Sequence, residues 1–113
     1  MELPALLPEF AKDMGALATH RLFAACFKRD DQAAASLAEF LLSLYDARVG
    51  KLDTYMLCRS IDAEHFDDVI TVLQWFRFAE NGFDVHHVFG KEQGARMMRN
   101  LIRKLATQFT PLI

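Results

Sequence analysis

Hydrophobic residues recur three and four positions apart along most of the chain, and this spacing predicts α-helices. Short polar or glycine-containing stretches interrupt the pattern and separate one predicted helix from the next. We therefore expect helices over Glu9–Lys28 (with a weak point at Gly15), Gln32–Ala47, Thr54–Arg59, Asp62–Asn81 and Lys91–Phe109.

The segment Asp62–Asn81 carries more apolar positions than one helix face can hold. One predicted arc contains Phe66, Val69, Ile70, Leu73 and Phe76, and a nearly opposite arc contains Val72, Trp75 and Ala79. A surface helix needs only one such stripe. Residues 62–80 are therefore predicted to be the central helix, with the Trp75 arc covered either by the first helix or by a partner.

Residues at the helix boundaries agree with these ranges. Asp62, Asp53 and the pair Asp30-Asp31 precede predicted helices, where an aspartate can accept a hydrogen bond from the first turn. Gly50 is predicted to end the second helix in a left-handed conformation. The segment 83–90 lies between two helices, and its apolar residues are expected to fold over the core.

Length and composition indicate one globular domain. The chain has 113 residues, of which 52% are hydrophobic and 25% charged, so it can bury a core of its own. The expected fold is an all-α, compact single-domain bundle of four main helices and one short helix over residues 1–113, with 1–8 as an extended arm and 110–113 as a tail. Cys26 and Cys58 are expected to be buried free thiols.

No apolar run approaches the roughly 18 residues of a membrane span. The N-terminus also lacks the basic and apolar regions of a signal peptide. We expect a cytoplasmic protein that does not associate with membranes.

Charge is distributed unevenly along the chain. Residues 1–90 contain eight Lys/Arg and fourteen Asp/Glu, whereas residues 91–113 contain five and one. Arg96, Arg99 and Arg103 share one face of the last helix, with Lys91 and Lys104 nearby. This stripe is a solvated face, a phosphate-binding surface, or a surface that binds an acidic protein.

The acidic residues suggest a second type of binding surface. Asp30, Asp31, Asp46, Asp53, Glu64, Asp67 and Asp68 could present carboxylates where a nucleic acid would present phosphates. Most of them are also explained as helix caps or solvated side chains. Asp67, Asp68, Trp75, Arg96, Arg99 and Arg103 are the candidate partner-binding residues.

Catalytic and metal-binding motifs are weak. His65 and Asp68 are neighbours on a helix, and His86 or His87 could complete a metal site with them. Cys58, His65 and Asp62 are close in sequence, but a catalytic triad is defined by its geometry. The chain contains no HExxH, GxSxG or glycine-rich phosphate-binding motif. We therefore expect no catalytic residue, metal or cofactor, and keep a metal-dependent hydrolase using His65 and Asp68 as an alternative.

Residues 37–73 resemble a family of small uncharacterised proteins from prophages and integrative elements of proteobacteria. The matching features are Ala38–Leu42, Tyr45–Ala47, Gly50, Leu52-Asp53, Leu57, Asp62-Ala63, and Asp68 with Thr71–Leu73. The family usually has a tryptophan where this chain has Tyr45. The resemblance implies an accessory protein of a mobile element, and it assigns no catalytic residue.

The predicted function is non-enzymatic protein–protein interaction, specifically inhibition of a host defence or regulatory complex in the manner of anti-CRISPR proteins. The expected partner is a host protein or protein complex, and the second apolar arc could also support a homodimer. The net charge of −2 argues against nucleic acid as the general partner. A small DNA-binding regulator that uses the basic last helix is the first alternative.

Overall fold

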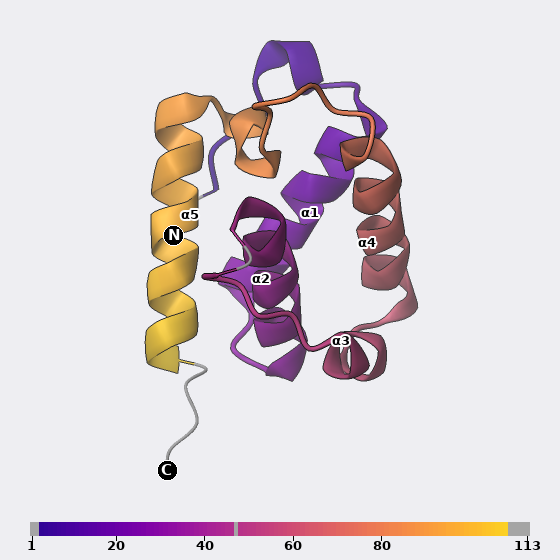
Figure 1. Cartoon of the computed structure of the whole chain (residues 1–113), viewed down its shortest axis with the longest axis vertical. Helices are drawn as coiled ribbons and strands as arrows, with labels where there is room; N and C mark the ends of the chain where they lie inside the picture. Colours follow the sequence, from indigo (N-terminus) through magenta and orange to yellow (C-terminus); the bar gives the residue numbers. More distant parts are fainter. Residues whose placement is uncertain (1–2, 47, 109–113) are drawn as a thin grey trace.

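The computed structural model describes residues 3–46 and 48–108. Over these residues the chain forms five α-helices and two short 3₁₀ helices, and it contains no strand (Figure 1). In chain order they are η1 (Pro8–Phe10), α1 (Met14–Lys28), α2 (Gln32–Tyr45), α3 (Thr54–Ser60), α4 (Ala63–Phe76), η2 (Val85–Phe89) and α5 (Lys91–Gln108). The prediction of an all-α bundle of four main helices and one short helix is confirmed.

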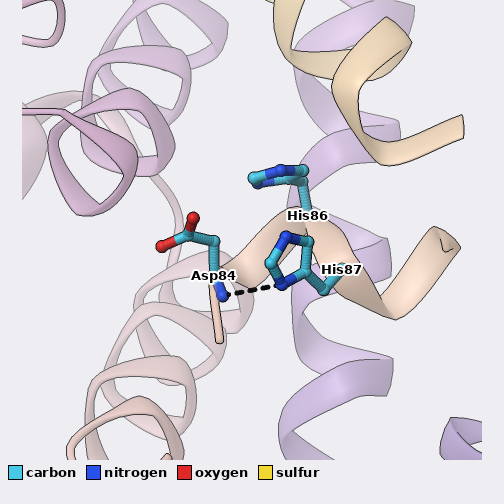
Figure 2. Close-up of side chains that lie close together, drawn as sticks. All are labelled: Asp84, His86 and His87. Carbon is cyan, nitrogen blue, oxygen red and sulfur yellow. Dashed lines mark hydrogen bonds between the residues drawn. The ribbon is translucent and has the colours of Figure 1, made fainter. Parts of the chain in front are cut away.

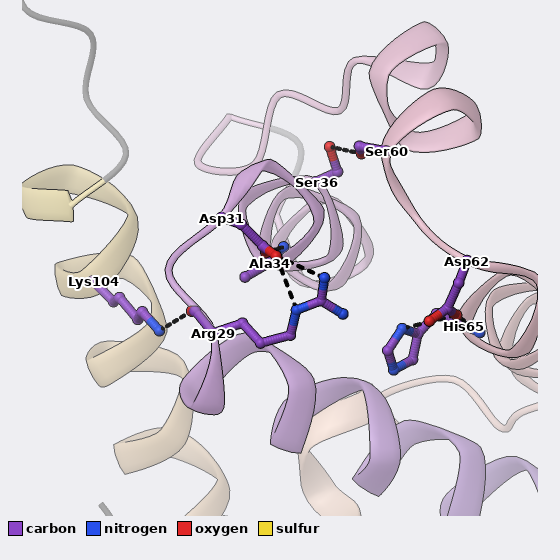
Figure 3. Close-up of polar contacts among 8 residues, drawn as sticks. All are labelled: Arg29, Asp31, Ala34, Ser36, Ser60, Asp62, His65 and Lys104. Carbon is purple, nitrogen blue, oxygen red and sulfur yellow. Dashed lines mark hydrogen bonds and ion pairs between the residues drawn. The ribbon is translucent and has the colours of Figure 1, made fainter.

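Helices α1 and α2 form the centre of the bundle. Nine of the 14 residues of α2 are buried, and this helix packs against α1, α3 and α5. Its alanines allow close approach on several sides, while Phe40, Leu41 and Leu42 fill the space between the helices. The buried hydroxyl of Ser36 accepts a hydrogen bond from Ser60 (3.0 Å), which joins α2 to the end of α3 (Figure 3).

Helix α4 lies at one side of the bundle, across α1 and α2 from α5 (Figure 1). It packs mainly on α1, and only Val69 and Val72 are buried along its length. The prediction that residues 62–80 form the central helix is therefore wrong. The bulky apolar residues of this segment suggested burial on two sides, but the alanine-rich α2 occupies the centre because small residues pack more closely.

Four helices begin with an aspartate that caps the first turn. Asp13, Asp31, Asp53 and Asp62 each accept a hydrogen bond from the backbone N–H three residues later, at 2.8–3.1 Å. Three of these caps were predicted, and Asp13 was not. Because Asp13 starts α1, the predicted helix from Glu9 is divided into η1 and α1 before Gly15 is reached.

Two predicted helix ends are wrong. Gly50 does not adopt a left-handed conformation, since the glycines with positive φ among the described residues are Gly82 and Gly90. Gly50 instead lies so close to α2 that an added Cβ would be 2.3 Å from the Ser43 nitrogen. Helix α4 ends at Phe76 and not at Asn81, because the N–H groups of Phe78 and Ala79 turn back to carbonyls three residues earlier.

The segments around the last helix complete the core. Val85, Val88 and Phe89 are buried as predicted, and they belong to the short helix η2. Leu7 in the N-terminal segment donates its N–H to the Val88 carbonyl (2.9 Å). The predicted positions of Ala47, Phe109, the first two residues of the arm and the tail 110–113 lie outside the described residues.

The two cysteines differ in their surroundings. Cys26 is a buried free thiol, as predicted, whereas Cys58 is exposed, so its predicted burial is wrong. Among the residues of α3 only Leu57 is buried, and Cys58 beside it is exposed to solvent. None of the described helices is long and apolar enough to cross a membrane.

Candidate functional site

The two apolar arcs of α4 differ in how far they are buried. Val72, in the arc that was expected to be covered by the first helix or by a partner, is fully buried. Phe66, Ile70 and Leu73 from the other arc are 38%, 39% and 42% exposed, whereas Val69 of that arc is 2% exposed. The three exposed residues follow one another at helical spacing and form an outward apolar stripe, which we call the α4 ridge.

Trp75 is covered by α1, at the position where that helix has no side chain. A Cβ added to Gly15 would lie 2.0 Å from Cγ of Trp75, so the indole ring rests directly on the backbone of α1. Phe83 packs edge-on against the same ring, with 5.5 Å between the centroids. Trp75 is therefore a partly buried packing residue, and Gly15 determines how closely α4 approaches α1.

A hollow of about 260 Å³ lies at the C-terminal end of α4. Trp75, Phe10 and Phe83 line it, and Phe78 at its edge is 78% exposed. The guanidinium of Arg77 lies 4.8 Å from the centre of the Phe78 ring. None of the ridge residues lines this hollow, which is a separate apolar feature with the charged Arg77 and Glu80 beside it.

The candidates Asp67 and Asp68 have different surroundings. Asp68 accepts two hydrogen bonds from the guanidinium of Arg21, at 2.9 and 3.0 Å, and its side chain is only 13% exposed. This bidentate ion pair joins α1 to α4, and Asp68 raises the pKa of Arg21. Asp67 is exposed, so its carboxylate remains a candidate for partner binding.

The basic stripe of α5 is exposed as predicted. Arg96, Arg99 and Arg103 face solvent, and the first two line a shallow hollow with Glu92. Lys104 does not belong to this stripe. Its ammonium donates to the carbonyls of Cys26 and Arg29 at 2.5 and 2.7 Å, and therefore caps the C-terminal end of α1 (Figure 3).

Ion pairs neutralise much of the predicted acidic surface. Asp30 pairs with Lys104 (3.2 Å), and Asp68 pairs with Arg21. Asp31 and Asp46 pair with Arg29 and Arg48, which hold the pKa of each carboxyl below its usual value.

Asp30, Asp31, Asp53 and the half-buried Glu39 also line one hollow, where burial raises the pKa of Glu39. Two of these acids cap helices. The arrangement of the carboxylates therefore gives little support to a surface that imitates the phosphates of a nucleic acid.

His65 lies at the start of α4, beside the cap of that helix. Its Nδ1 is 3.1 Å from the Asp62 carboxylate, although without hydrogen-bonding geometry (Figure 3). Asp68, the second proposed ligand, is occupied by Arg21. The structure does not place His65 and Asp68 with His86 or His87 in one group of metal-binding side chains among the described residues.

A different group of side chains converges at η2. Asp84, His86 and His87 each offer a ligand atom, and these atoms lie within 4.8 Å of one another. The backbone N–H of Asp84 donates to Nδ1 of His87 at 3.1 Å, the contact drawn in Figure 2. In the sequence these residues appear as an aspartate followed by histidines two and three positions later. His86 and His87 were considered only as residues that could complete a metal site with His65 and Asp68.

The fold and these surfaces define a small all-α protein that leaves one apolar helix face exposed. The chain belongs to the family described as Family of unknown function (DUF7673), whose model matches residues 16–106. The match extends from the first turn of α1 to the last turns of α5. No curated protein and no solved structure matches the chain at a significant level.

Proposed function

We propose that the protein is a non-enzymatic interaction module that binds another protein through the α4 ridge. The observation that carries this proposal is the exposure of Phe66, Ile70 and Leu73 on one face of a helix whose opposite face is buried. Adjacent apolar side chains on a surface are typical of sites that bind other proteins.

The charges around the ridge suit a specific contact. Glu64 and Asp67 lie near the N-terminal end of α4, and Arg77 follows its C-terminal end. Protein interfaces commonly combine an apolar centre with a polar rim. The acidic end and the basic end would orient the partner along the helix, because reversal would bring like charges together.

The class of partner follows from the resemblance of residues 37–73 to accessory proteins of prophages and integrative elements. We propose a cytoplasmic protein of mobile-element origin that inhibits a host defence or regulatory complex, as anti-CRISPR proteins do. The small size of the chain and its exposed apolar helix are compatible with such a role.

Site-specific photo-crosslinking tests the binding surface. A photoreactive phenylalanine derivative at position 70 should crosslink to a host protein in cells, whereas the same group at Arg99 should not. Arg99 is the control because it is exposed on α5, which lies across α1 and α2 from α4 (Figure 1). Equal crosslinking at both positions, or none at position 70, would contradict binding through the ridge.

The inhibitor role requires a separate measurement. In cells with an active CRISPR system, expression of the protein should raise the transformation efficiency of a plasmid that the system targets. Leu73→Asp should abolish this effect, and Gln74→Ala should preserve it. If interference is unchanged by the wild-type protein, the anti-CRISPR role fails even where crosslinking identifies a different host partner.

DNA binding is the second candidate function, because Arg96, Arg99 and Arg103 remain exposed on one side of α5. In that case the protein should shift duplex DNA in a gel, with an affinity that falls steeply as salt increases. Arg99→Ala and Arg103→Ala should each weaken the shift and reduce its salt dependence.

A homodimer through the ridge is distinguished from both functions by sedimentation, where Leu73→Asp would convert dimer to monomer.

A further inference from the structure

The 3₁₀ turn between α4 and α5 brings two imidazoles and a carboxylate into one cluster. The ligand atoms of Asp84, His86 and His87 all lie within 4.8 Å of one another. Figure 2 shows the two rings one above the other, with the Asp84 carboxylate beside them. We propose that this cluster binds a divalent transition-metal ion of the Zn²⁺ type.

An unsatisfied buried nitrogen supports the site. His86 is only 6% exposed, and its Nδ1 is buried without a hydrogen-bond partner. Buried polar atoms in folded proteins nearly always have a partner, and an unpaired one requires an explanation. A metal ion bound to this nitrogen supplies the missing interaction. The geometry therefore assigns Nδ1 of His86 as one ligand atom.

The histidine rings are held in place by their neighbours. Tyr45 packs edge-on against His86, with 5.2 Å between the centroids, and Phe83 packs in the same way against His87 at 5.7 Å. A Cβ added to Gly94 would lie 2.9 Å from Cδ2 of His86, so α5 also confines this ring. Side chains whose rotation is restricted to a small range favour metal binding because less rotational freedom is lost on coordination.

The charge and the donor chemistry of the cluster also suit a cation. A metal ion binds an imidazole nitrogen of the neutral ring, where that nitrogen has a lone pair. Asp84 contributes one negative charge, which favours a cation over an anion at this position.

The donor set selects the class of ion. Two imidazole nitrogens and one carboxylate oxygen match the ligands of Zn²⁺ and related transition metals, and three protein ligands leave a fourth position open. Zinc lies about 2.0–2.2 Å from such atoms, so donors around a tetrahedral ion are roughly 3.3 Å apart. Because no pair of these ligand atoms is more than 4.8 Å apart, binding requires an approach of at most about 1.5 Å, which small rotations of the side chains supply.

Metal binding would also change the tautomer of His87. Nδ1 of this ring accepts the Asp84 N–H, so the proton of the neutral ring resides on Nε2. Coordination through Nε2 moves that proton to Nδ1 and releases the Asp84 N–H from its hydrogen bond. The amide resonance of Asp84 is therefore a specific reporter of metal binding.

The test is titration of Zn²⁺ into tag-free, chelator-treated protein by calorimetry. We expect one ion per chain, and at least about tenfold weaker binding for His86→Asn, His87→Ala and Asp84→Asn. Asp84→Asn is informative because Asp84 is the N-cap of η2, and asparagine caps helices equally well but is a poorer metal ligand. His65→Ala should bind Zn²⁺ as the wild type does, which separates this site from one at His65 and Asp68.

A second test uses nuclear magnetic resonance of the wild-type protein, so it does not depend on whether a variant folds. Zn²⁺ should shift the ring nitrogens of His86 and His87 and the Asp84 amide, and leave the ring nitrogens of His20 and His65 unchanged. The site is rejected if Zn²⁺ does not bind saturably, or if the shifts occur at His20 or His65. Because neither measurement involves a partner protein, the result is independent of binding through the α4 ridge.

Discussion

At the scale of single residues, the contact between Gly15 and Trp75 determines the packing of two helices. Glycine inside a helix usually lowers stability relative to alanine by about 1 kcal/mol. Here the missing side chain provides the space in which the only tryptophan of the chain lies against α1. The benefit of this close contact therefore depends on both residues together.

Gly15→Ala should destabilise the protein despite the higher helix propensity of alanine. The new Cβ would lie 2.0 Å from Cγ of Trp75, and the overpacking should cost about 1–3 kcal/mol. Urea denaturation followed by circular dichroism measures the effect. In a Trp75→Ala background the same substitution should be neutral or stabilising, and an equal loss in both backgrounds would show that the contact with Trp75 is not the cause.

The two cysteines should differ sharply in reactivity. Burial raises the pKa of the Cys26 thiol to about 12, whereas Cys58 is exposed. Since the thiolate is the reactive form, a thiol reagent at pH 8 should modify one cysteine per native chain and two after denaturation. Cys58→Ser should remove the native-state reaction. Rapid modification of the native Cys58→Ser variant would show that Cys26 is accessible.

At the scale of helices, α4 shows that hydrophobic spacing identifies a helix but not the face that it buries. The segment has two apolar arcs, and either could have faced the core. Helix α1 leaves space at Gly15 for the large Trp75, and Val72 of the same arc is fully buried. The ridge residues were left outside, where they form the candidate binding surface.

Substitutions on the two faces of α4 should have very different effects. Ile70→Asp introduces a charge at a position that is 39% exposed, and should lower the free energy of unfolding by about 1 kcal/mol or less. Val72→Asp buries an unpaired charge, and should cost several kcal/mol or prevent folding. Thermal denaturation of both variants checks the orientation of α4. Comparable losses at the two positions would be incompatible with an exposed ridge.

At the scale of the whole molecule, Lys104 connects the last helix, α5, to the C-terminal end of α1. Its ammonium reaches the last carbonyls of α1 and the carboxylate of Asp30, 74 to 78 residues earlier in the sequence. A cation at this position is favoured because the C-terminal end of a helix carries partial negative charge. The contact fixes α5 against α1 and the following loop.

Lys104→Met should weaken this attachment while keeping most of the aliphatic side chain. Two carbonyls would lose a charged donor, so the free energy of unfolding should fall by about 1–3 kcal/mol. Urea unfolding gives the value, and Arg103→Met is the control because Arg103 is exposed on the same helix. If the Lys104 variant were as stable as this control, the interhelical contact would contribute nothing measurable.

The sequence alone was sufficient for the fold class and most helix positions. The caps at Asp31, Asp53 and Asp62 and the spacing of apolar residues depend on contacts within about one turn of helix, which the sequence specifies directly. The helical spacing of Met97, Met98 and Leu101 likewise agrees with their burial on one side of α5. The helix ends near Gly50 and Phe76 were predicted wrongly, because packing against α2 and turns after α4 decided them.

Only the tertiary structure decided which surfaces are available for function. The sequence located Trp75, Asp68 and Lys104 on helices, but their partners Gly15, Arg21 and Cys26 come from other segments. It also contained Asp84, His86 and His87, yet their convergence required the 3₁₀ turn and the packing of Tyr45 and Gly94 around it. Helix formation is governed by neighbours along the chain, whereas the orientation of a helix and the assembly of a site depend on residues that become neighbours only on folding.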